Sequence, residues 1–554
     1  PSAARSFTLP PGLRNSHLPR MVQPVSALGP FRVMSGVLPI RLMMSGAIMA
    51  ADYPRRRPRT RKLWFPPPKA RYLEGMRRLL PLLLLPGLLP VLLPVLLLVS
   101  CSDGREGGTL SVHTVGDGQL GARLVSDATE GRLIGRDAAG EPVPQLATSW
   151  RFLDGGESLI LRLAPDRWPD GKELQSADVV ASIRARRSDP AIIAAGLDAR
   201  RATRAPITRV VELNTSRPGP LLLEWLAEPA FTVRRRNLPF PGPYRIEPGE
   251  TAEAPITLVR RAADPLPAAR PSRITLARHE APDAAIAAWR AGTADVVLGE
   301  GLAGLDAARA AARGQALRIE PVWGVIGLAI NGRTGPLASG DLRRALAMAV
   351  DRPALADALA GGGGTLPGGA PATDWRSRSA EANRAEAAAL FAAAGISPAT
   401  PITLHLLAPP GPEHRRIAAQ LALMWEPLGV QLDIANPPAA ERARRLERGT
   451  YDLATLELAP AVPDAAALLS RWQCRRSRAC VAAADTLLAE ALGAPDPAAQ
   501  AAGLAAAEAA WMAAPPFIPL TTPLRWSLVA PQVDGFAANG IGLHPLGRLE
   551  RRRR

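Results

Sequence analysis

Several residue types and motifs that carry common catalytic chemistry are scarce or missing from this chain of 554 residues. Cysteine occurs three times and histidine six times, and no two histidines stand in a His-x-x-x-His or His-Glu-x-x-His pattern, which argues against a zinc enzyme. No Gly-x-Ser-x-Gly elbow is present, which argues against an α/β-hydrolase. The longest glycine run, residues 361–364, lacks the lysine of a phosphate-binding loop. The sequence therefore predicts no catalytic site, no metal site and no cofactor.

Net charge is also missing from most of the chain, although the formal charge of the whole is +17. Residues 1–78 hold 15 basic and 2 acidic side chains, and residues 551–554 are all arginine. Residues 79–550 are neutral, with 48 side chains of each sign. A neutral body argues against binding to nucleic acid, which depends on many lysine and arginine contacts to phosphate. The chain of 554 residues is long enough for roughly two to four domains, and its 47% of hydrophobic residues can form a sizeable core.

The N-terminal region shows the features of an export signal. Residues 1–75 are rich in arginine and proline, have no sustained helical or strand period, and are expected to be disordered and absent from the mature protein. Residues 76–100 open with Met-Arg-Arg and continue as an uncharged stretch of leucine, valine and proline, typical of a signal peptide. A membrane-spanning helix is the alternative, disfavoured by four prolines. Residues 98–101, Leu-Val-Ser-Cys, resemble the lipobox of bacterial lipoproteins, so we expect acylation of Cys101 and a tether at residues 101–108.

The other two cysteines, Cys474 and Cys480, lie close together in the sequence. In an exported chain such a pair predicts a disulfide that closes a short loop. A metal site is the rival interpretation, but four nearby nitrogen or sulfur ligands are absent.

The pattern of apolar residues changes along the body of the chain. Up to about residue 259 it is mostly strand-like, with a turn at Asp170 and Gly171 and a helix capped by Ser176, as is typical of an α+β domain. From residue 274 strands alternate with helices, which implies a parallel or mixed sheet with helices on its faces. Strands are expected at residues 158–163, 274–277, 294–298, 402–407, 430–434, 451–456 and 517–520, and helices at residues 283–292, 412–428, 438–447 and 496–512.

Six short segments occur in an order and spacing that match a known family. Two of them are Pro-Val-Pro-Gln-Leu-Ala-Thr-Ser-Trp, which ends at Trp150, and Trp-Pro-Asp-Gly, which begins at Trp168. Together they resemble the extracellular solute-binding proteins of family 5, the peptide- and nickel-binding type that supply ABC importers. The matching segments are residues 141–150, 167–180, 241–246, 291–296, 331 with 341–352, and 428–430 with 519–520.

The resemblance implies an α/β fold with an α+β first lobe. This is the two-lobed periplasmic binding protein fold, type II and cluster C-like, in which a ligand is enclosed between lobes by hinge closure. It places lobe 1 at residues 109–278 plus 518–549 and lobe 2 at residues 279–517. The chain is expected to pass between the lobes near residues 277–280 and 517–520, and residues 550–554 are expected to form a basic tail.

The resemblance also implies that both lobes provide ligand-binding residues, because closure shields a ligand only if each lobe contributes contacts to it. Peptide-binding members pair an aspartate with the α-ammonium of the peptide, and the nearest acids in this chain are Asp464 and Glu457. Aromatic residues make up only 4% of the chain, yet 11 of them are tryptophan, which offers a flat face to a ligand or a core. The candidate ligand-binding residues are His113 and Asp117 in lobe 1 and Trp323, Asp464 and Trp472 in lobe 2. Core packing by the tryptophans and helix capping by Asp464 are the alternatives.

The function implied is that of the extracytoplasmic solute-binding component of an ABC importer. Such a protein captures a peptide or another small solute and delivers it to the membrane permease. We expect a monomer in the periplasm, held to a membrane by its lipid anchor. The alternatives are an exported interaction or assembly factor that reuses the fold, favoured by a filled cleft, and an exported hydrolase, favoured by a cluster of acids or histidines with perturbed pKa in the cleft.

Overall fold

The computed structural model describes residues 108–197, 203–217, 219–249, 254–262, 269–360, 375–494 and 496–552. The expected disordered segment (1–75), the signal peptide (76–100) and the acylation site Cys101 with the tether up to residue 107 lie outside the described residues. Within the part that is described, no helix has both the length and the apolar character needed to cross a membrane.

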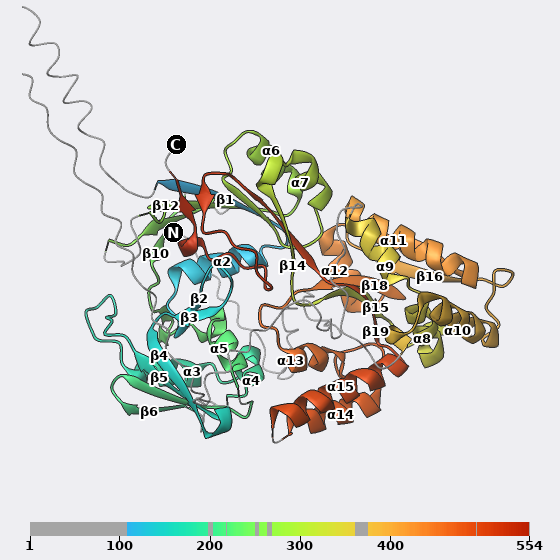
Figure 1. Ribbon diagram of the computed structural model, residues 1–554, viewed down its shortest axis with the longest axis horizontal. Coiled ribbons are helices and arrows are strands. Elements are labelled where there is room, and N and C mark those ends of the chain that lie inside the picture. The colour runs from blue at the N-terminus through green and yellow to red at the C-terminus, as the bar shows by residue number, and fades with distance from the viewer. Residues whose placement is uncertain are drawn as a thin grey trace, which may run out of the picture. The chain divides into compact units, whose positions relative to one another are not determined.

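A seven-stranded mixed sheet combines six strands from residues 109–321 with one strand from residues 524–529. Strands β1, β12 and β13 run parallel with β1 in the middle, and the other neighbours are antiparallel. Leu110 and Val112 of β1 share a core with helix α2 (Gln119–Thr129), whereas Val115 packs with helices α6 (Pro282–Arg290) and α7 (Leu305–Ala311), so helices cover both faces (Figure 1). In sheet order the strands are β10 (Tyr244–Glu247), β11 (Ile256–Arg260), β12 (Arg273–His279), β1 (Thr109–Val115), β13 (Val296–Gly299), β20 (Leu524–Val529) and β14 (Leu317–Pro321).

A second, antiparallel sheet has a core of its own. Its order is β4–β5–β7–β6, and Leu159 and Leu161 of the second strand are fully buried beneath its helices. Trp168 completes this core: its indole donates to Asp178 at 3.0 Å, and its ring meets Phe240 edge-on with 4.9 Å between centroids. The elements are β4 (Ala147–Leu153), β5 (Ser158–Leu163), β6 (Thr203–Ile207), β7 (Val210–Asn214), α3 (Ser176–Ala185), α4 (Pro190–Ala194) and α5 (Leu221–Leu226). Both sheets together give a mixed α/β architecture, in the part of the chain where the sequence predicts an α+β lobe.

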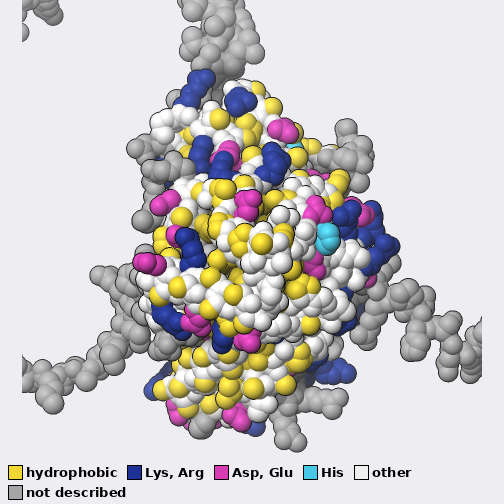
Figure 2. Space-filling view, turned by 90° about the vertical axis from the view of Figure 1, so that its right-hand side faces the viewer, with side chains coloured by type: hydrophobic (Ala, Val, Ile, Leu, Met, Phe, Trp, Pro, Cys, Tyr) yellow, Lys and Arg dark blue, Asp and Glu magenta, His cyan; other side chains and the backbone are white. Residues whose placement is uncertain are grey.

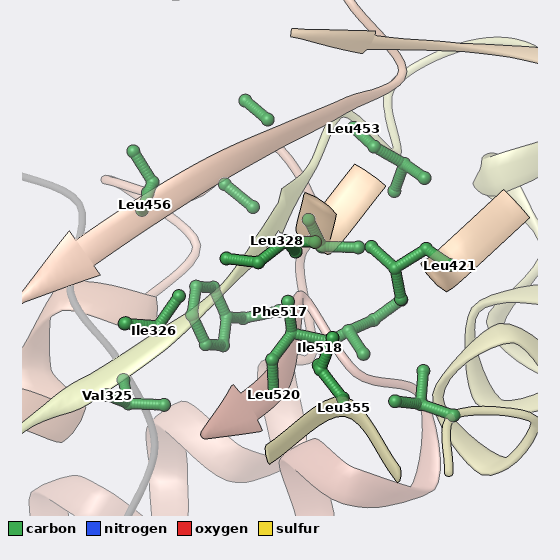
Figure 3. Packing of buried hydrophobic residues seen from close by; sticks show 14 of the residues in the cluster. Val325, Ile326, Leu328, Leu355, Leu421, Leu453, Leu456, Phe517, Ile518 and Leu520 are labelled. Atoms are coloured by element: carbon green, nitrogen blue, oxygen red, sulfur yellow. The ribbon is translucent and has the colours of Figure 1, made fainter. Parts of the chain in front are cut away.

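A five-stranded sheet forms the centre of the rest of the chain. Strand β15 is buried along its whole length between two antiparallel neighbours, and its Leu328 lies close to Phe517 and Ile518 of the next strand (Figure 3). Continuous burial explains why residues 325–330 form an uninterrupted apolar run. In sheet order the strands are β17 (Val430–Ala435), β16 (Ile402–Leu407), β18 (Leu453–Leu458), β15 (Val325–Ile330) and β19 (Phe517–Thr521). The helices of this part are α8 (Gly340–Met348), α9 (Arg352–Ala360), α10 (Ala380–Ala393), α11 (Pro412–Trp425), α12 (Ala439–Arg448), α13 (Ala465–Leu469), α14 (Ala482–Leu492) and α15 (Pro497–Ala513).

The chain passes between the seven-stranded and the five-stranded sheet at residues 322–324 and 522–523. Gly324 has φ of +141°, and a Cβ atom there would lie 2.0 Å from the carbonyl oxygen of Leu458, so only glycine fits. The first passage therefore lies later than the expected one near residues 277–280. The reason is that β12, α6 and β13 form a β-α-β unit whose two strands both pair with β1. The first part of the alternation, residues 273–299, therefore belongs to the seven-stranded sheet, and the part at residues 402–458 belongs to the five-stranded sheet.

Some helix starts differ from the expected ones by one or two residues. Gln175, not Ser176, precedes α3 as its N-cap, in a reciprocal pair with Asp178. At α8 the capping oxygen comes from Ser339, which accepts from the amide of Leu342 at 3.4 Å. Asp496 caps α15 through the amide of Ala499 at 2.8 Å, as the sequence predicts.

The C-terminal residues are part of the fold as far as they are described. Strand β22 (Glu550–Arg551) pairs with β21 (Val533–Asp534), and Arg551 contacts Asp295 at 3.2 Å. Residues 550–552 therefore differ from the expected free basic tail. Figure 2 shows acidic and basic side chains mixed over one face of the molecule, with basic side chains gathered at one edge beside a histidine.

Candidate functional site

Two carboxylates meet at the edge of the seven-stranded sheet where the parallel strands end. Asp117 follows β1, and Glu300 follows β13, its neighbour in the sheet. Asp117 Oδ1 accepts from the amide of Gln119 at 3.0 Å, and Glu300 Oε1 accepts from the amide of Leu120 at 3.1 Å. Both acids therefore sit at the N-terminus of α2, where free backbone N–H groups favour negative charge. Crevices outside the carboxyl ends of parallel strands are common ligand sites.

The carboxyl of Glu300 has a raised pKa beside Asp117. Burial raises the pKa of the Glu300 carboxyl to about 8, and its hydrogen bond to Asp117 and the charge of Asp117 act in the same direction. The Leu120 amide and Arg525 lower this pKa but do not offset the other effects. With a pKa of about 8, the Glu300 carboxyl is mostly protonated at neutral pH.

Charged side chains of the five-stranded sheet reach the same region. Glu457 of β18 accepts from Arg525 of β20 at 2.5 Å and from the amide of Leu302 at 3.1 Å. Burial raises the pKa of Glu457, whereas Arg525 and the Leu302 amide lower it. Because Arg525 also acts on Glu300, the network joins acids that come from two different sheets.

His113 lies within β1, four residues before Asp117. Its Nδ1 is 3.0 Å from Nε2 of His279 at the end of β12, and the two rings stack with 5.1 Å between centroids. Burial lowers the pKa of both rings, and for His113 the neighbouring His279 lowers it further. Two neutral rings of this kind form one hydrogen bond, in which one nitrogen donates and the other accepts. Among the described residues, no three His, Cys, Asp or Glu side chains are arranged to hold a metal ion.

Asp464 binds two side chains that come from the region around the four-stranded sheet, Arg217 after β7 and Trp225 in α5. Its side chain is only 1% exposed, and its two oxygens accept from Nη1 and Nη2 of Arg217 at 2.5 and 2.6 Å. The indole of Trp225 donates to it at 3.1 Å, and the amide of Ala467 at 3.1 Å makes it the N-cap of α13. The capping role that the sequence allows for Asp464 is therefore present, together with an ion pair that it does not reveal.

The two candidate tryptophans lie in different surroundings. Trp472 is 1% exposed and packs against Phe517, with 4.5 Å between ring centroids. Trp323 is half-buried in the passage between the sheets, where its amide donates to the carbonyl of Gly540 at 2.7 Å. The predicted disulfide between Cys474 and Cys480 is present a few residues beyond Trp472.

The structure brings Asp117 together with Glu300, Arg525 and Glu457, and it places Asp464 with Arg217. Glu300 was missed by sequence reasoning, although a charged residue flanked by Gly299 and Gly301 directly after a buried strand is a usable signal. Arg217 lies in a loop and has no comparable signal.

A model of the bacterial extracellular solute-binding proteins, family 5 (middle region), matches residues 141–478 of the chain. The chain belongs to this family. Its members are extracellular or periplasmic binding proteins that serve ABC importers for peptides, nickel and similar ligands, and this solute-binding function is that of the chain. No curated protein matches the sequence.

Solved structures of family 5 proteins share the fold. The murein tripeptide binding protein MppA of Escherichia coli superimposes with a TM-score of 0.67 at 20% identity over 81% of this chain and 99% of that one. Haemophilus influenzae OppA in complex with the peptide RPPGFSPFR gives 0.66 at 17% identity over 81% and 99%. Staphylococcus aureus NikA in complex with Ni(L-His)2 gives 0.61 at 16% identity over 79% and 98%. The two-lobed fold expected from the sequence is confirmed.

Proposed function

We propose that this family 5 protein captures its solute in the crevice at the ends of β1 and β13, between a first lobe and a second lobe. The first lobe contains the seven-stranded and four-stranded sheets, and the second contains the five-stranded sheet. The observation that carries the proposal is that Glu457 from the second lobe meets Arg525 of the first beside Glu300 and Asp117. A solute there contacts groups from both lobes, as enclosure requires.

Closure of the lobes is supported by the way the chain connects them. Only two short passages, at residues 322–324 and 522–523, join the two sheets within the described residues. Rotation about such passages is a hinge motion, in which a few residues absorb the change in φ and ψ. The solute is a peptide or another small molecule with polar groups that match the carboxyls and Arg525.

The carboxyl pair suits binding better than hydrolysis. The hydrogen bond between Asp117 and Glu300 holds the two carboxyls together, whereas the carboxyls of a glycosidase stand apart on either side of the scissile bond. With a pKa of about 8, Glu300 keeps its proton at neutral pH and can donate it to a solute in place of Asp117, and carboxyl oxygens of the pair can accept. The pair therefore provides both kinds of hydrogen bond at one place.

Native mass spectrometry of the purified protein tests the solute site. We expect a co-purified small molecule whose occupancy falls at least tenfold in Asp117→Ala, because the exposed Asp117 contributes a direct contact. The matched control is Asp433→Ala, which removes an exposed carboxylate that pairs with His405 in the five-stranded sheet. Equal solute occupancy in wild type and in Asp117→Ala would place the site elsewhere.

We further propose that the mature protein is a monomer that begins at an acylated Cys101 and delivers its solute to the permease of an ABC importer. The support is the sequence Leu-Val-Ser-Cys after an uncharged segment. Cys101→Ala should release the protein from the membrane fraction in a cell fractionation experiment. A wild-type protein that keeps the full precursor length would indicate a membrane helix instead.

A further inference from the structure

The contact of Arg217 with Asp464 joins two separately packed parts of the molecule. Arg217 follows β7, and the carbonyl oxygen of Ala194 accepts a hydrogen bond from its Nη1. Asp464 follows β18 and caps α13, whose Leu469 is buried in the core that contains the five-stranded sheet. In Figure 1, α5, which carries Trp225, lies toward α13. The ion pair and the indole hydrogen bond thus run from the first lobe to the second.

The acceptor positions of Asp464 are all in use. A carboxylate has about four lone-pair positions. Two are filled by the guanidinium of Arg217, one by the indole of Trp225 and one by the amide of Ala467. With the side chain 1% exposed, no acceptor position remains for a solute, and the negative charge already has a bidentate cationic partner.

We propose that Arg217, Trp225 and Asp464 form a clasp that holds the two lobes together without a solute and excludes Asp464 from solute recognition. This inference rests on the proposed function, because it assumes that the lobes separate to admit a solute. Separation must break the bidentate ion pair, whereas the Glu457–Arg525 contact lies beside the passages. The guanidinium of Arg217 occupies the position at Asp464 where a cationic group of a solute would bind. The solute is therefore bound by residues other than Asp464.

The clasp makes a definite prediction for the equilibrium between open and closed forms. A contact present only in the closed form shifts the equilibrium by its differential free energy. Removal of the ion pair should therefore raise the open fraction of the solute-free protein. Asp464→Asn is the sharpest change, because the amide keeps the shape of the side chain and one oxygen for the α13 cap.

The experiment measures the distance between the lobes by single-molecule fluorescence energy transfer. Dyes are attached at Ile207→Cys in β6 and Leu423→Cys in α11, whose side chains are 65% and 63% exposed. Cys101→Ala is included so that only the new thiols react, since Cys474 and Cys480 are bonded to each other. The protein is unfolded in guanidinium with the disulfide intact, washed and refolded, and native mass spectrometry confirms that no solute is bound.

The expected result is one population with a short distance for the wild type. Asp464→Asn and Arg217→Gln should each increase the long-distance fraction at least fivefold, and the exchanged pair Arg217→Asp with Asp464→Arg should restore part of the short-distance fraction. The matched control is Arg204→Gln, which breaks an exposed ion pair with Glu212 inside the first lobe and should change nothing. A cooperative thermal transition shows that each variant is folded.

Identical distance distributions for the wild type, Asp464→Asn and Arg217→Gln would overturn the clasp. So would a wild type that is already open without solute. Both outcomes leave the solute site untouched, because no solute takes part in the measurement. Conversely, loss of the site at Asp117 in the mass spectrometry experiment would leave the clasp unaffected.

Discussion

Glu457 and Asp464 are two of the buried carboxylates that connect the lobes, and their positions relative to the passages differ. Glu457 in β18 lies opposite Ile326, which is in β15, the strand that follows the first passage. Glu457 binds Arg525, which is in β20, the strand that follows the second passage. Asp464 binds Arg217 and Trp225, which belong to the part of the first lobe built around the four-stranded sheet. The Glu457–Arg525 contact lies next to both passages, so the covalent chain keeps its partners close together. Arg217 and Asp464 are far from the passages in the sequence, so their contact depends on its own hydrogen bonds.

This difference decides what each contact contributes. A contact beside a hinge persists when the lobes move, so removal of one partner leaves a buried charge in every folded conformation. A contact away from the hinge breaks when the lobes separate, and water then solvates both charges. Glu457 should therefore control the stability of the folded protein, whereas Asp464 should control the equilibrium between its conformations.

The largest effect is expected for Glu457→Ala. It removes the carboxylate partner of Arg525, whose side chain is 15% exposed. The loss of one partner of a buried pair lowers the free energy of unfolding by about 3–5 kcal/mol. Urea unfolding followed by circular dichroism measures it, and Arg204→Ala, at an exposed pair, should stay within about 0.5 kcal/mol of the wild type. A loss below about 1 kcal/mol would mean that water already reaches Glu457.

A smaller effect is expected from the pH dependence of Glu300. Its pKa is about 8 in the folded protein, above the value of an unfolded glutamate, about 4.3. The folded form then binds the extra proton between these two values, so this group's contribution to stability is present at low pH and is lost as the pH rises toward 8.

The test is the free energy of unfolding at pH 5 and at pH 8. Glu300→Gln cannot ionise and still donates a hydrogen bond to Asp117, so it should be less sensitive to this pH change than the wild type and more stable than the wild type at pH 8. Equal pH profiles for the two proteins would show that Glu300 is ionised in the folded state.

The smallest change in unfolding free energy is expected for Arg217→Gln. Separation of the lobes hydrates Asp464, so the cost should stay below about 1 kcal/mol, as for an exposed ion pair. The same urea titration measures it beside Glu457→Ala. A loss as large as that of Glu457→Ala would remove the distinction between the two contacts and show that the lobes do not separate at Asp464.

The fold could be predicted largely from local patterns, because turns, caps and apolar periods leave direct marks in the sequence. The boundary between the lobes could not be predicted in this way. The alternation of strands and helices in the sequence is the same whether β13 joins the seven-stranded or the five-stranded sheet. Asp117 could be suggested from its place after a strand, but Glu300 becomes its partner only through the pairing of β1 with β13. Asp464 shows the same limit: its cap is local, and Arg217 reaches it from the other lobe.

The register at the base of the second lobe has a practical consequence. Strands β14 and β20 are antiparallel neighbours, and Pro321 lies opposite Leu524, so the chain leaves the first lobe and re-enters it at adjacent positions. The second lobe is thus an insertion at the tip of a β-hairpin. Replacement of residues 322–523 by a short Asn-Gly turn should yield a miniature protein that consists of the first lobe alone. Such a fragment would allow the half-site with Asp117 and Glu300 to be studied by NMR spectroscopy.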